Sequence, residues 1–321
     1  MHEIEIIFNI WLQNMGGWLS IPMQIISFLG TQYFQIMLFA CIYWCIDQKT
    51  AIRLGMALIA GNCLNVGLKW IFHAPRPYWI NTAVKPLSNE SSFGVPSGHA
   101  MMSTIFYGRI ALWLKEKWLT IFIVAIIFLI GLSRLYLGVH FLSDVITGLA
   151  FGILFLIIFT GLEQPVSKWL NQINFSSRIA MFFISSLLVI FFFSLFRYLL
   201  SSWQIPEDWL KNVETAGLAD SIDPIRIKDI FTLAGLGFGM MTGYAWIKKY
   251  VFFQNPGNRT QNIIRLVFGF SGLAVLMFFP VKIYEWLTPE AMKLGFIYFH
   301  YFLISFWITG AAPVIFQKFG F

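Results

Sequence analysis

The chain has 321 residues, of which 58% are hydrophobic and only 12% are charged. A soluble globular domain carries about 25% charged residues, so this composition excludes a water-soluble fold. Thirty-five Phe and thirteen Trp exclude intrinsic disorder, and three Cys are too few for a disulfide-stapled secreted module. The cations behind the net charge of +7 are spread over several short loops, so we expect no nucleic-acid partner. The composition predicts an integral membrane protein.

Residues 1–17 are predicted to form an amphipathic helix in the membrane interface. Ile4, Phe8 and Trp11 share one helical face, whereas Glu5 and Asn9 lie elsewhere around the helix. The segment is not a secretory signal, because its first residues carry two Glu and no Lys or Arg. The alternative is that this segment forms a tenth span together with the residues that follow.

Nine later runs are long and apolar enough to cross a hydrocarbon layer of about 30 Å. They lie at about residues 20–46, 50–72, 98–114, 117–137, 142–162, 178–200, 229–247, 262–284 and 293–316. We therefore predict an all-α fold, a polytopic bundle of about nine transmembrane helices.

The distribution of Lys and Arg predicts the orientation of the bundle. With nine spans and the N-terminus outside, twelve cations lie on the cytoplasmic side and ten on the other, and three of those ten belong to the polar clusters described below. We therefore expect an external N-terminus and a cytoplasmic C-terminus. With short loops and no cleavable signal, the chain is predicted to be a multi-pass plasma-membrane protein, in the inner membrane of a bacterium.

Three polar clusters stand beside these apolar runs, where charged groups need a reason because they are expensive within a membrane. The clusters are residues 69–77, which end the second span, residues 96–99, which open the third, and residues 133–144, which join the fourth to the fifth. Counting the spans puts all three clusters on the same membrane face. They can therefore converge on one site.

The second cluster has the features of an anion site. Pro96-Ser97-Gly98-His99 indicates a helix start, with Ser97 as the N-cap and Gly98 allowing close approach to the backbone. The free N–H groups and the dipole of a helix start attract anions. Three cations from the other clusters can join it and match a phosphate monoester, namely Lys69, Arg76 and Arg134.

The third cluster supplies a candidate nucleophile. His140 and Asp144 are four residues apart on one helical face, so the carboxylate can accept the proton of one imidazole nitrogen and leave the other free. His99 lies beside the predicted anion site and could be held protonated there as a general acid.

The order KX6RP, PSGH, SRX5HX3D resembles the three-part signature of the type 2 phosphatidic acid phosphatase family. The resemblance covers about residues 20–162. It implies that His140 attacks phosphorus to form a phosphohistidine, that Asp144 orients it, and that His99 protonates the leaving group. It also implies that the phosphoryl oxygens are held by Lys69, Arg76, Ser97, Gly98 and Arg134, and that no metal or organic cofactor is needed.

The amphipathic pattern, the motifs and the later apolar runs together predict an interfacial helix at 1–17, a phosphatase core at 18–162 and additional transmembrane helices at 163–321. The expected partners are membrane lipids and a lipid phosphate substrate, a monoester or a diphosphate. Two alternatives remain open: a phosphotransferase with the same intermediate, and a transporter that binds phosphorylated lipids without cleaving them. The motifs specify neither the lipid nor an oligomeric state.

Overall fold

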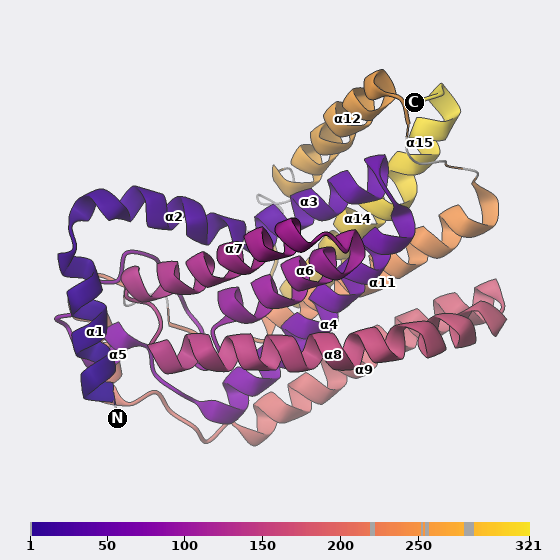
Figure 1. Cartoon of the computed structure of the whole chain (residues 1–321). Helices are drawn as coiled ribbons and strands as arrows, with labels where there is room; N and C mark the ends of the chain where they lie inside the picture. Colours follow the sequence, from indigo (N-terminus) through magenta and orange to yellow (C-terminus); the bar gives the residue numbers. More distant parts are fainter. Residues whose placement is uncertain (1, 219–221, 252, 254–256, 279–285) are drawn as a thin grey trace. The chain divides into compact units, whose positions relative to one another are not determined.

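The computed structural model describes residues 2–218, 222–251, 253, 257–278 and 286–321. Their regular structure is helical throughout (Figure 1). The longer helices are α1 (His2–Asn14), α2 (Ser20–Leu29), α3 (Gln32–Cys45), α4 (Gln48–Phe72), α6 (Gly98–Leu114), α7 (Lys117–Tyr136), α8 (Leu142–Gln172), α9 (Phe175–Leu199), α10 (Glu207–Thr215), α11 (Lys228–Tyr250), α12 (Arg259–Phe278), α14 (Glu290–Phe306) and α15 (Ala312–Phe319). A 3-10 turn (Gly17–Leu19), a short α5 (Pro77–Ile80) and a π-helical turn (Trp307–Ala311) complete the set.

The predicted all-α, polytopic membrane architecture is confirmed, but the count of nine spans is not. Seven helices among the described residues are long and apolar enough to span a membrane, or up to eight if the bent pair 17–29 and 32–45 is one span. The predicted span at 98–114 coincides with α6, whose 17 residues extend about 25 Å and fall short of a bilayer core. Residues 279–284 of the predicted eighth span lie outside the described residues.

α8 is longer than the sequence pattern indicates. We expect a span ending near residue 162, but the helix continues to Gln172 and contains Pro165. The apolar pattern persists beyond the expected end, because Leu162, Val166 and Trp169 follow at spacings of four and three residues and share one face. The helix therefore remains amphipathic past the proline.

The chain forms two compact units that are assembled from interleaved segments. One unit contains residues 1–35, 60–160 and 199–226, and the other contains residues 36–59, 161–198 and 227–321. All three polar clusters lie in the first unit, so this unit alone holds the candidate site. In the second unit α11 packs on α14, where Gly235 and Gly239 lie directly against backbone carbonyl groups of the partner helix.

Two glycines bring the second and third clusters together within the first unit. Gly148 and Gly152 occupy one face of α8, and a Cβ atom on either would lie within 2.9 Å of α6 or of the residue that precedes it. Small residues at this spacing allow two helices to approach closely. The close contact places the start of α6 beside the start of α8, where the amide of Ser97 donates to the carbonyl of Asp144 at 3.0 Å.

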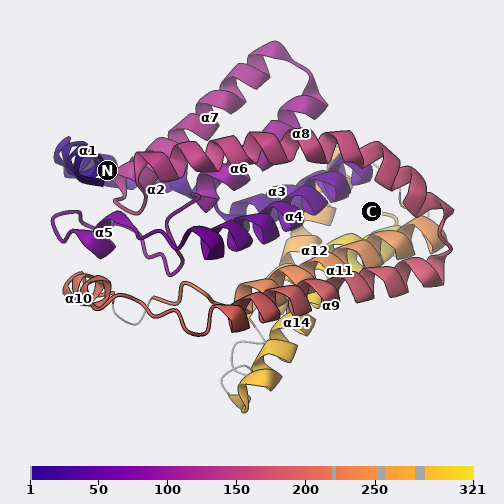
Figure 2. The same cartoon turned by 90° about the horizontal axis from the view of Figure 1, so that it is seen from below.

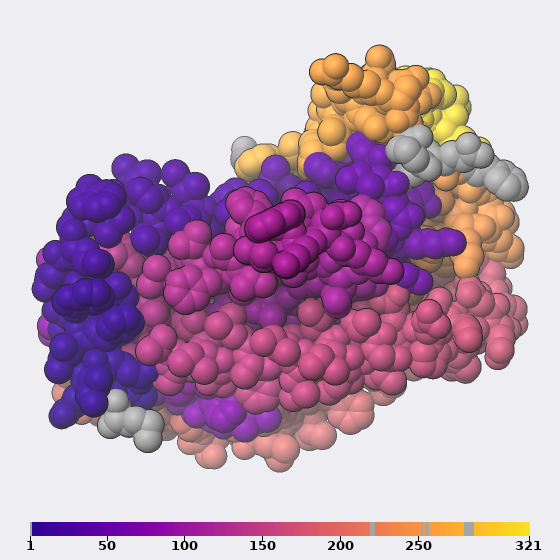
Figure 3. Space-filling model, in the orientation of Figure 1, coloured from indigo at the N-terminus to yellow at the C-terminus, as the bar shows by residue number. Residues whose placement is uncertain are grey.

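α1 runs crosswise to α7 and α8 at the ends that carry the third cluster (Figures 1 and 2). Its apolar side chains Ile4, Ile7 and Trp11 are exposed, and the helix forms an outer edge of the first unit (Figure 3). The polar side chains of Glu5, Asn9 and Gln13 point the other way. The polar face, which the sequence analysis left without a role, contacts the loop that bears His140.

Candidate active site

Asn9 and Glu5 of α1 fix the loop between α7 and α8. Asn9 is buried, and its Nδ2 donates to the carbonyls of Leu135 at 2.8 Å and of His140 at 3.1 Å. One carboxylate oxygen of Glu5 accepts from the amide of Ser143 at 2.7 Å. These bonds satisfy backbone groups that the end of α7 and the start of α8 leave without helical partners. The loop is therefore anchored on both sides of His140.

His140 and Asp144 form the pair that the sequence predicts. Nδ1 of the buried imidazole lies 3.1 Å from Oδ2 of Asp144, which also accepts from the amide of Phe141 at 2.9 Å. Nε2 lies 3.2 Å from Nη1 of Arg76. A guanidinium can only donate, so Nε2 accepts and the imidazole proton lies on Nδ1. Both neighbours thus select the tautomer whose Nε2 carries a lone pair.

The surroundings also keep this imidazole neutral. Burial lowers the pKa of His140 well below its usual value, and the positive charges of Arg76 and Lys69 lower it further. Burial disfavours the imidazolium because it removes the charge from water, and nearby cations repel it. His140 is therefore an oriented neutral base or nucleophile.

Arg76 and Lys69 converge on the loop that precedes α6. Arg76 begins α5, and its guanidinium donates to the carbonyls of Ser92 at 2.6 Å and of Val139 at 2.8 Å. Lys69 lies in the last turn of α4, and its Nζ donates to the carbonyl of Phe93 and to Oγ of Ser92 at 3.2 Å. Both cations are buried, so the first cluster delivers two positive charges beside His140.

Arg134 is the third buried cation. Its Nη1 donates to Oγ of Ser27 at 2.6 Å, and its Nη2 pairs with a carboxylate oxygen of Glu90. Its Nε makes no hydrogen bond to the described residues, although it is buried. A buried N–H without an acceptor costs about 1–3 kcal/mol, so this donor fits an anion that the protein itself does not supply.

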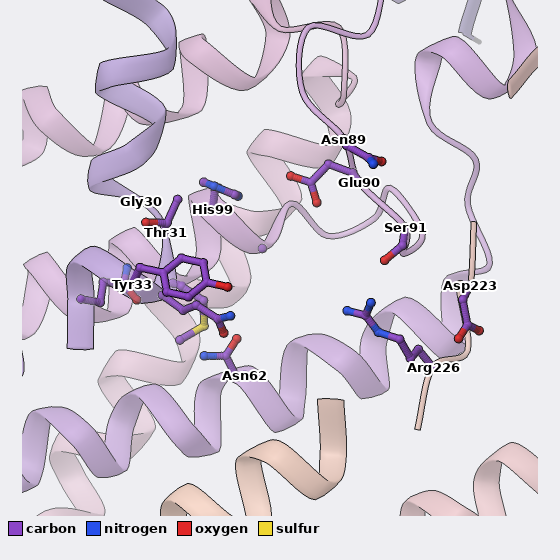
Figure 4. Close-up of a pocket in the computed structure, with 14 residues that line it drawn as sticks. Gly30, Thr31, Tyr33, Asn62, Asn89, Glu90, Ser91, His99, Asp223 and Arg226 are labelled. Carbon is purple, nitrogen blue, oxygen red and sulfur yellow. The ribbon is translucent and has the colours of Figure 1, made fainter. Parts of the chain in front are cut away.

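The start of α6 adds further donors. Ser97 occupies the predicted N-cap position, but its side chain makes no capping bond, and its buried Oγ has no partner among the described residues. A Cβ atom on Gly98 would lie 3.2 Å from Oδ1 of Asn65, so glycine permits the close approach of α4. His99 follows and lines a cavity of about 750 Å³ (Figure 4). The first N–H groups of α6 have no helical partner and favour an anion.

Glu90 is the main residue of the site that the sequence analysis missed. Its carboxylate contacts Arg134, and its second oxygen lies 3.6 Å from Nη2 of Arg76. Burial alone would raise the pKa of Glu90, but the guanidinium groups of Arg134 and Arg76 lower it to about 2, so the group is ionised. One feature of the sequence does set Glu90 apart, since it is the only acidic residue between residues 73 and 97.

The structure thus brings all eight predicted residues into one unit. Arg76 and His140 are in contact, Arg76 and Arg134 share Glu90, and the backbones of Ser97 and Asp144 are hydrogen-bonded. Among the described residues no group of three or more His, Cys, Asp or Glu side chains could hold a metal ion. Buried cations around an oriented neutral imidazole, at the ends of membrane helices, define a membrane enzyme that handles a phosphoryl group.

Comparison with known proteins identifies the family. Residues 50–168 match the PAP2 superfamily, and residues 231–321 match the transmembrane extension of PAP2 superfamily phosphatases. Phosphatidylglycerophosphatase B of Bacillus subtilis is 34% identical over 165 residues, which cover 47% of this chain and 79% of that protein. The chain belongs to the type 2 phosphatidic acid phosphatase family, as the motifs predict.

Other relatives show how widely this family has diversified. Glucose-6-phosphatase catalytic subunit 1 of Haplochromis nubilus is 25% identical over 240 residues, covering 62% of this chain and 64% of that protein. Sphingosine-1-phosphate phosphatase 1 of Rattus norvegicus is 28% identical over 185 residues, covering 54% of this chain and 41% of that protein. The chain thus matches less than two thirds of these two relatives.

A crystal structure of a transmembrane PAP2-type phosphatidylglycerolphosphate phosphatase from Bacillus subtilis matches with a TM-score of 0.43 and 26% identity. The match covers 49% of this chain and 85% of that chain. Two of the sequence relatives are named as phosphatases of lipid phosphates. The prediction of a lipid phosphate phosphatase is therefore confirmed at the level of enzyme class.

Proposed function

We propose that this chain hydrolyses a lipid phosphate through a covalent phosphohistidine at His140. The observation that carries the proposal is the geometry of that imidazole, with Nδ1 3.1 Å from Asp144 and Nε2 3.2 Å from Arg76. The guanidinium of Arg76 can bind the oxygens of a phosphoryl group. Because it lies beside Nε2, it would place the phosphorus atom within reach of the lone pair on that nitrogen.

In the first step Nε2 of His140 forms a bond to phosphorus while the phosphorus–oxygen ester bond breaks. In the free protein, burial and the guanidinium of Arg134 lower the pKa of His99 to about 3, which contradicts the expectation that it is held protonated there. A bound phosphate dianion counters the neighbouring cations, so that a protonated His99 gives its proton to the departing alkoxide, and Asp144 stabilises the positive charge that develops on the imidazole of His140. In the second step water attacks phosphorus, the phosphorus–nitrogen bond breaks, and His99 takes a proton from the water. The net reaction converts a phosphate ester and water into an alcohol and inorganic phosphate.

The phosphoryl oxygens would be held by Lys69, Arg76 and Arg134 together with Ser97 and the backbone at Gly98. The support comes from two buried donors, Nε of Arg134 and Oγ of Ser97, which have no partner among the described residues. Charge-assisted donors of this kind stabilise the charge that spreads over the oxygens in the transition state. This assignment needs no metal ion.

The proposed substrate is a lipid phosphate, and the site faces the outer side of a bacterial inner membrane. The lipid class rests on the names of two relatives, which act on phosphatidylglycerophosphate and sphingosine-1-phosphate. The outward orientation rests on the excess of Lys and Arg in the loops counted as cytoplasmic.

The proposal is tested with a lipid phosphate that carries a radioactive phosphoryl group, using the full chain in detergent. Rapid quenching should trap acid-labile label on the wild-type protein, and His140→Ala should show neither label nor phosphate release. His99→Ala should also lose turnover, by at least about a thousandfold. His300→Ala serves as the matched control, because His300 is outside the motifs and contacts the carbonyl of Leu276.

Three results would contradict the proposal. Unchanged turnover in His140→Ala would exclude that residue as the nucleophile, and complete loss of activity with a chelator would implicate a metal. Stable binding of the intact lipid with no phosphate released over hours would instead favour a transporter. Mass analysis with a candidate acceptor present distinguishes hydrolysis from transfer, because hydrolysis yields inorganic phosphate alone.

A further inference from the structure

The cavity beside His99 is lined by polar side chains. Its walls come from the break between α2 and α3, from α4, from the loop before α6 and from the loop before α11, all within the first unit. Figure 4 shows Tyr33, Asn62 and Arg226 across the cavity from His99 and Glu90. Since His99 is proposed to protonate the leaving oxygen, the atoms beyond that oxygen extend into this space.

The lining indicates what those atoms are. Carboxamide and hydroxyl groups dominate it, including those of Thr31, Tyr33, Asn62 and Ser91. An acyl chain placed there would remove these groups from water without offering them hydrogen bonds, which is unfavourable. A hydroxylated group would instead give these side chains hydrogen bonds in place of the ones they lose to water.

Gln35 is an independent sign of a ligand. It lines the cavity from the first turn of α3 and is only 2% exposed, yet its Nε2 makes no hydrogen bond to the described residues. Buried amide groups in proteins are almost always hydrogen-bonded, so this donor calls for an acceptor. A hydroxyl oxygen of a bound molecule would satisfy it.

The charges around the cavity argue against a second phosphate. The side chains that line the cavity include two carboxylates, Glu90 and Asp223, and one guanidinium, that of Arg226, besides the imidazole of His99; Glu90 is also paired with Arg134, which is not part of the lining. The loop with Asp223 is held in place, since its amide donates to the carbonyl of Ser91 at 3.2 Å. A diphosphate ester would bring an anionic leaving group against these carboxylates, whereas an uncharged alcohol meets no such repulsion.

We propose that this cavity binds the leaving alcohol and selects an uncharged one with free hydroxyl groups near the phosphate ester, as in a glycerol or sugar-alcohol phosphate. The inference rests on the proposed function, because it assigns the cavity to the leaving side of the same reaction. The hydroxylated alcohol can be linked to a lipid or be free in water.

The first test compares two lipids of matched acyl chains and one prenyl diphosphate, in detergent micelles with the wild-type protein. Dioleoyl phosphatidylglycerophosphate has a free hydroxyl beside its ester, whereas dioleoyl phosphatidate has none and farnesyl diphosphate has a phosphate as leaving group. We expect kcat/KM for the first to exceed that for the other two by at least about tenfold, since a site built to bind a hydroxyl rejects analogues that lack it.

Free glycerol 3-phosphate identifies the source of the alcohol. If glycerol 3-phosphate is hydrolysed faster than phosphatidate, the hydroxyl groups suffice for recognition. If phosphatidylglycerophosphate is hydrolysed but glycerol 3-phosphate is not, the acyl chains are needed as well. Equal or faster turnover of phosphatidate or of the diphosphate overturns the inference but leaves the proposed function intact. Failure to release phosphate from any of these substrates contradicts the proposed function itself.

The second test uses Gln35→Met, which keeps the length of the side chain and removes its donor. We expect the preference for phosphatidylglycerophosphate over phosphatidate to fall by about five- to tenfold. The inhibition constant of inorganic phosphate, which has no leaving group, should stay within about twofold of the wild-type value. This measurement shows whether the phosphate site is folded in the variant. Gln24→Met is the matched control, because Gln24 is exposed on α2 and does not line the cavity.

Tyr33→Phe is the second variant and removes one hydroxyl of the lining. It should also lower the preference, even if Gln35→Met does not fold. An unchanged preference in a folded Gln35→Met protein, or a change of the same size in Gln24→Met, would overturn the inference.

Discussion

Glu90 occupies arginine donors that a phosphoryl group would also use. Its carboxylate pairs with Arg134 and lies 3.6 Å from Arg76, and both arginines are buried. Without this carboxylate, the guanidinium groups would be buried without a counter-ion, which is unfavourable. With an anion bound, the same carboxylate repels it. Glu90 is therefore expected to stabilise the free protein and to weaken product binding.

Glu90→Gln should bind inorganic phosphate more tightly, by about tenfold, because the repulsion between two anions over a few ångströms is lost. Its melting temperature without phosphate should fall, and the rise on adding phosphate should exceed that of the wild-type protein. Both are measured from product inhibition and thermal unfolding in detergent, with Glu90→Asp as the charge-preserving control. Weaker phosphate binding in Glu90→Gln would show instead that Glu90 orders the two arginines.

The neutral state of His140 predicts a pH dependence of stability. Its pKa in the folded protein lies below the ordinary value of about 6.5, because of burial and neighbouring cations. The stability that this shift contributes is complete above about pH 6.5. It is lost as the pH falls below that value, since the unfolded chain then binds a proton that the folded chain excludes.

We therefore compare thermal unfolding of the wild-type protein and of His140→Gln between pH 7.5 and pH 5. The wild-type protein should lose stability relative to the variant as the pH falls, by at most about 1.4 kcal/mol per pH unit. Other titrating groups are present in both proteins, so their effects largely cancel in the difference. A difference that stays constant over this range would mean that His140 binds a proton equally in both states.

At the scale of elements, α1 holds the loop that carries His140 in place. Its polar residues reach both sides of His140 through Asn9 and Glu5, while Ile4 and Ile7 are exposed. The hydrophobic pattern correctly predicted a helix with two unlike faces. It could not predict what Asn9 and Glu5 contact, because their partners are the carbonyls of Leu135 and His140 and the amide of Ser143, more than a hundred residues away.

Asn9→Leu should lower kcat by about tenfold and change KM much less, because the substitution releases the carbonyl of His140 but touches no proposed substrate contact. Ile7→Leu, on the exposed face of the same helix, is the control and should resemble the wild-type protein. Kinetics with a lipid phosphate measure both parameters. A rise in KM of about tenfold with unchanged kcat would contradict the positioning role.

The candidate site could be predicted from the sequence because its chemistry lies in three short segments with fixed internal spacing. Counting spans predicted that Lys69, His99 and His140 can converge, and the structure brings them into one unit although the count of nine spans is not confirmed. Glu90 and Gln35 were not predictable, since neither has a spacing that marks a motif and their roles depend on which loops meet. The predicted end of α8 was wrong, because an amphipathic pattern continues to Gln172. The predicted bounds of α6 were right, but its 17 residues are too few for a span.

For the whole molecule, the predicted orientation can be tested with single cysteines in a background without Cys41, Cys45 and Cys63. Glu207→Cys lies at the start of α10, which we expect outside, and Gln172→Cys lies at the end of α8, which we expect in the cytoplasm. Both native side chains are exposed. A membrane-impermeant maleimide should label Glu207→Cys in intact bacteria and Gln172→Cys only after permeabilisation. The reverse pattern would place the site on the cytoplasmic face.

The bond between Asn9 and the carbonyl of His140 also affects how the protein is made. The two residues are 131 positions apart, so at about 5–20 residues per second the ribosome adds the second about 7–26 seconds after the first. During that interval Asn9 lacks both of its final acceptors, whereas Gln13 gains the carbonyl of Lys85 earlier in the chain. The carbonyls that fix Asn9 therefore exist only once residues 135–140 have been made, so the geometry around His140 is completed late in the synthesis of the first unit.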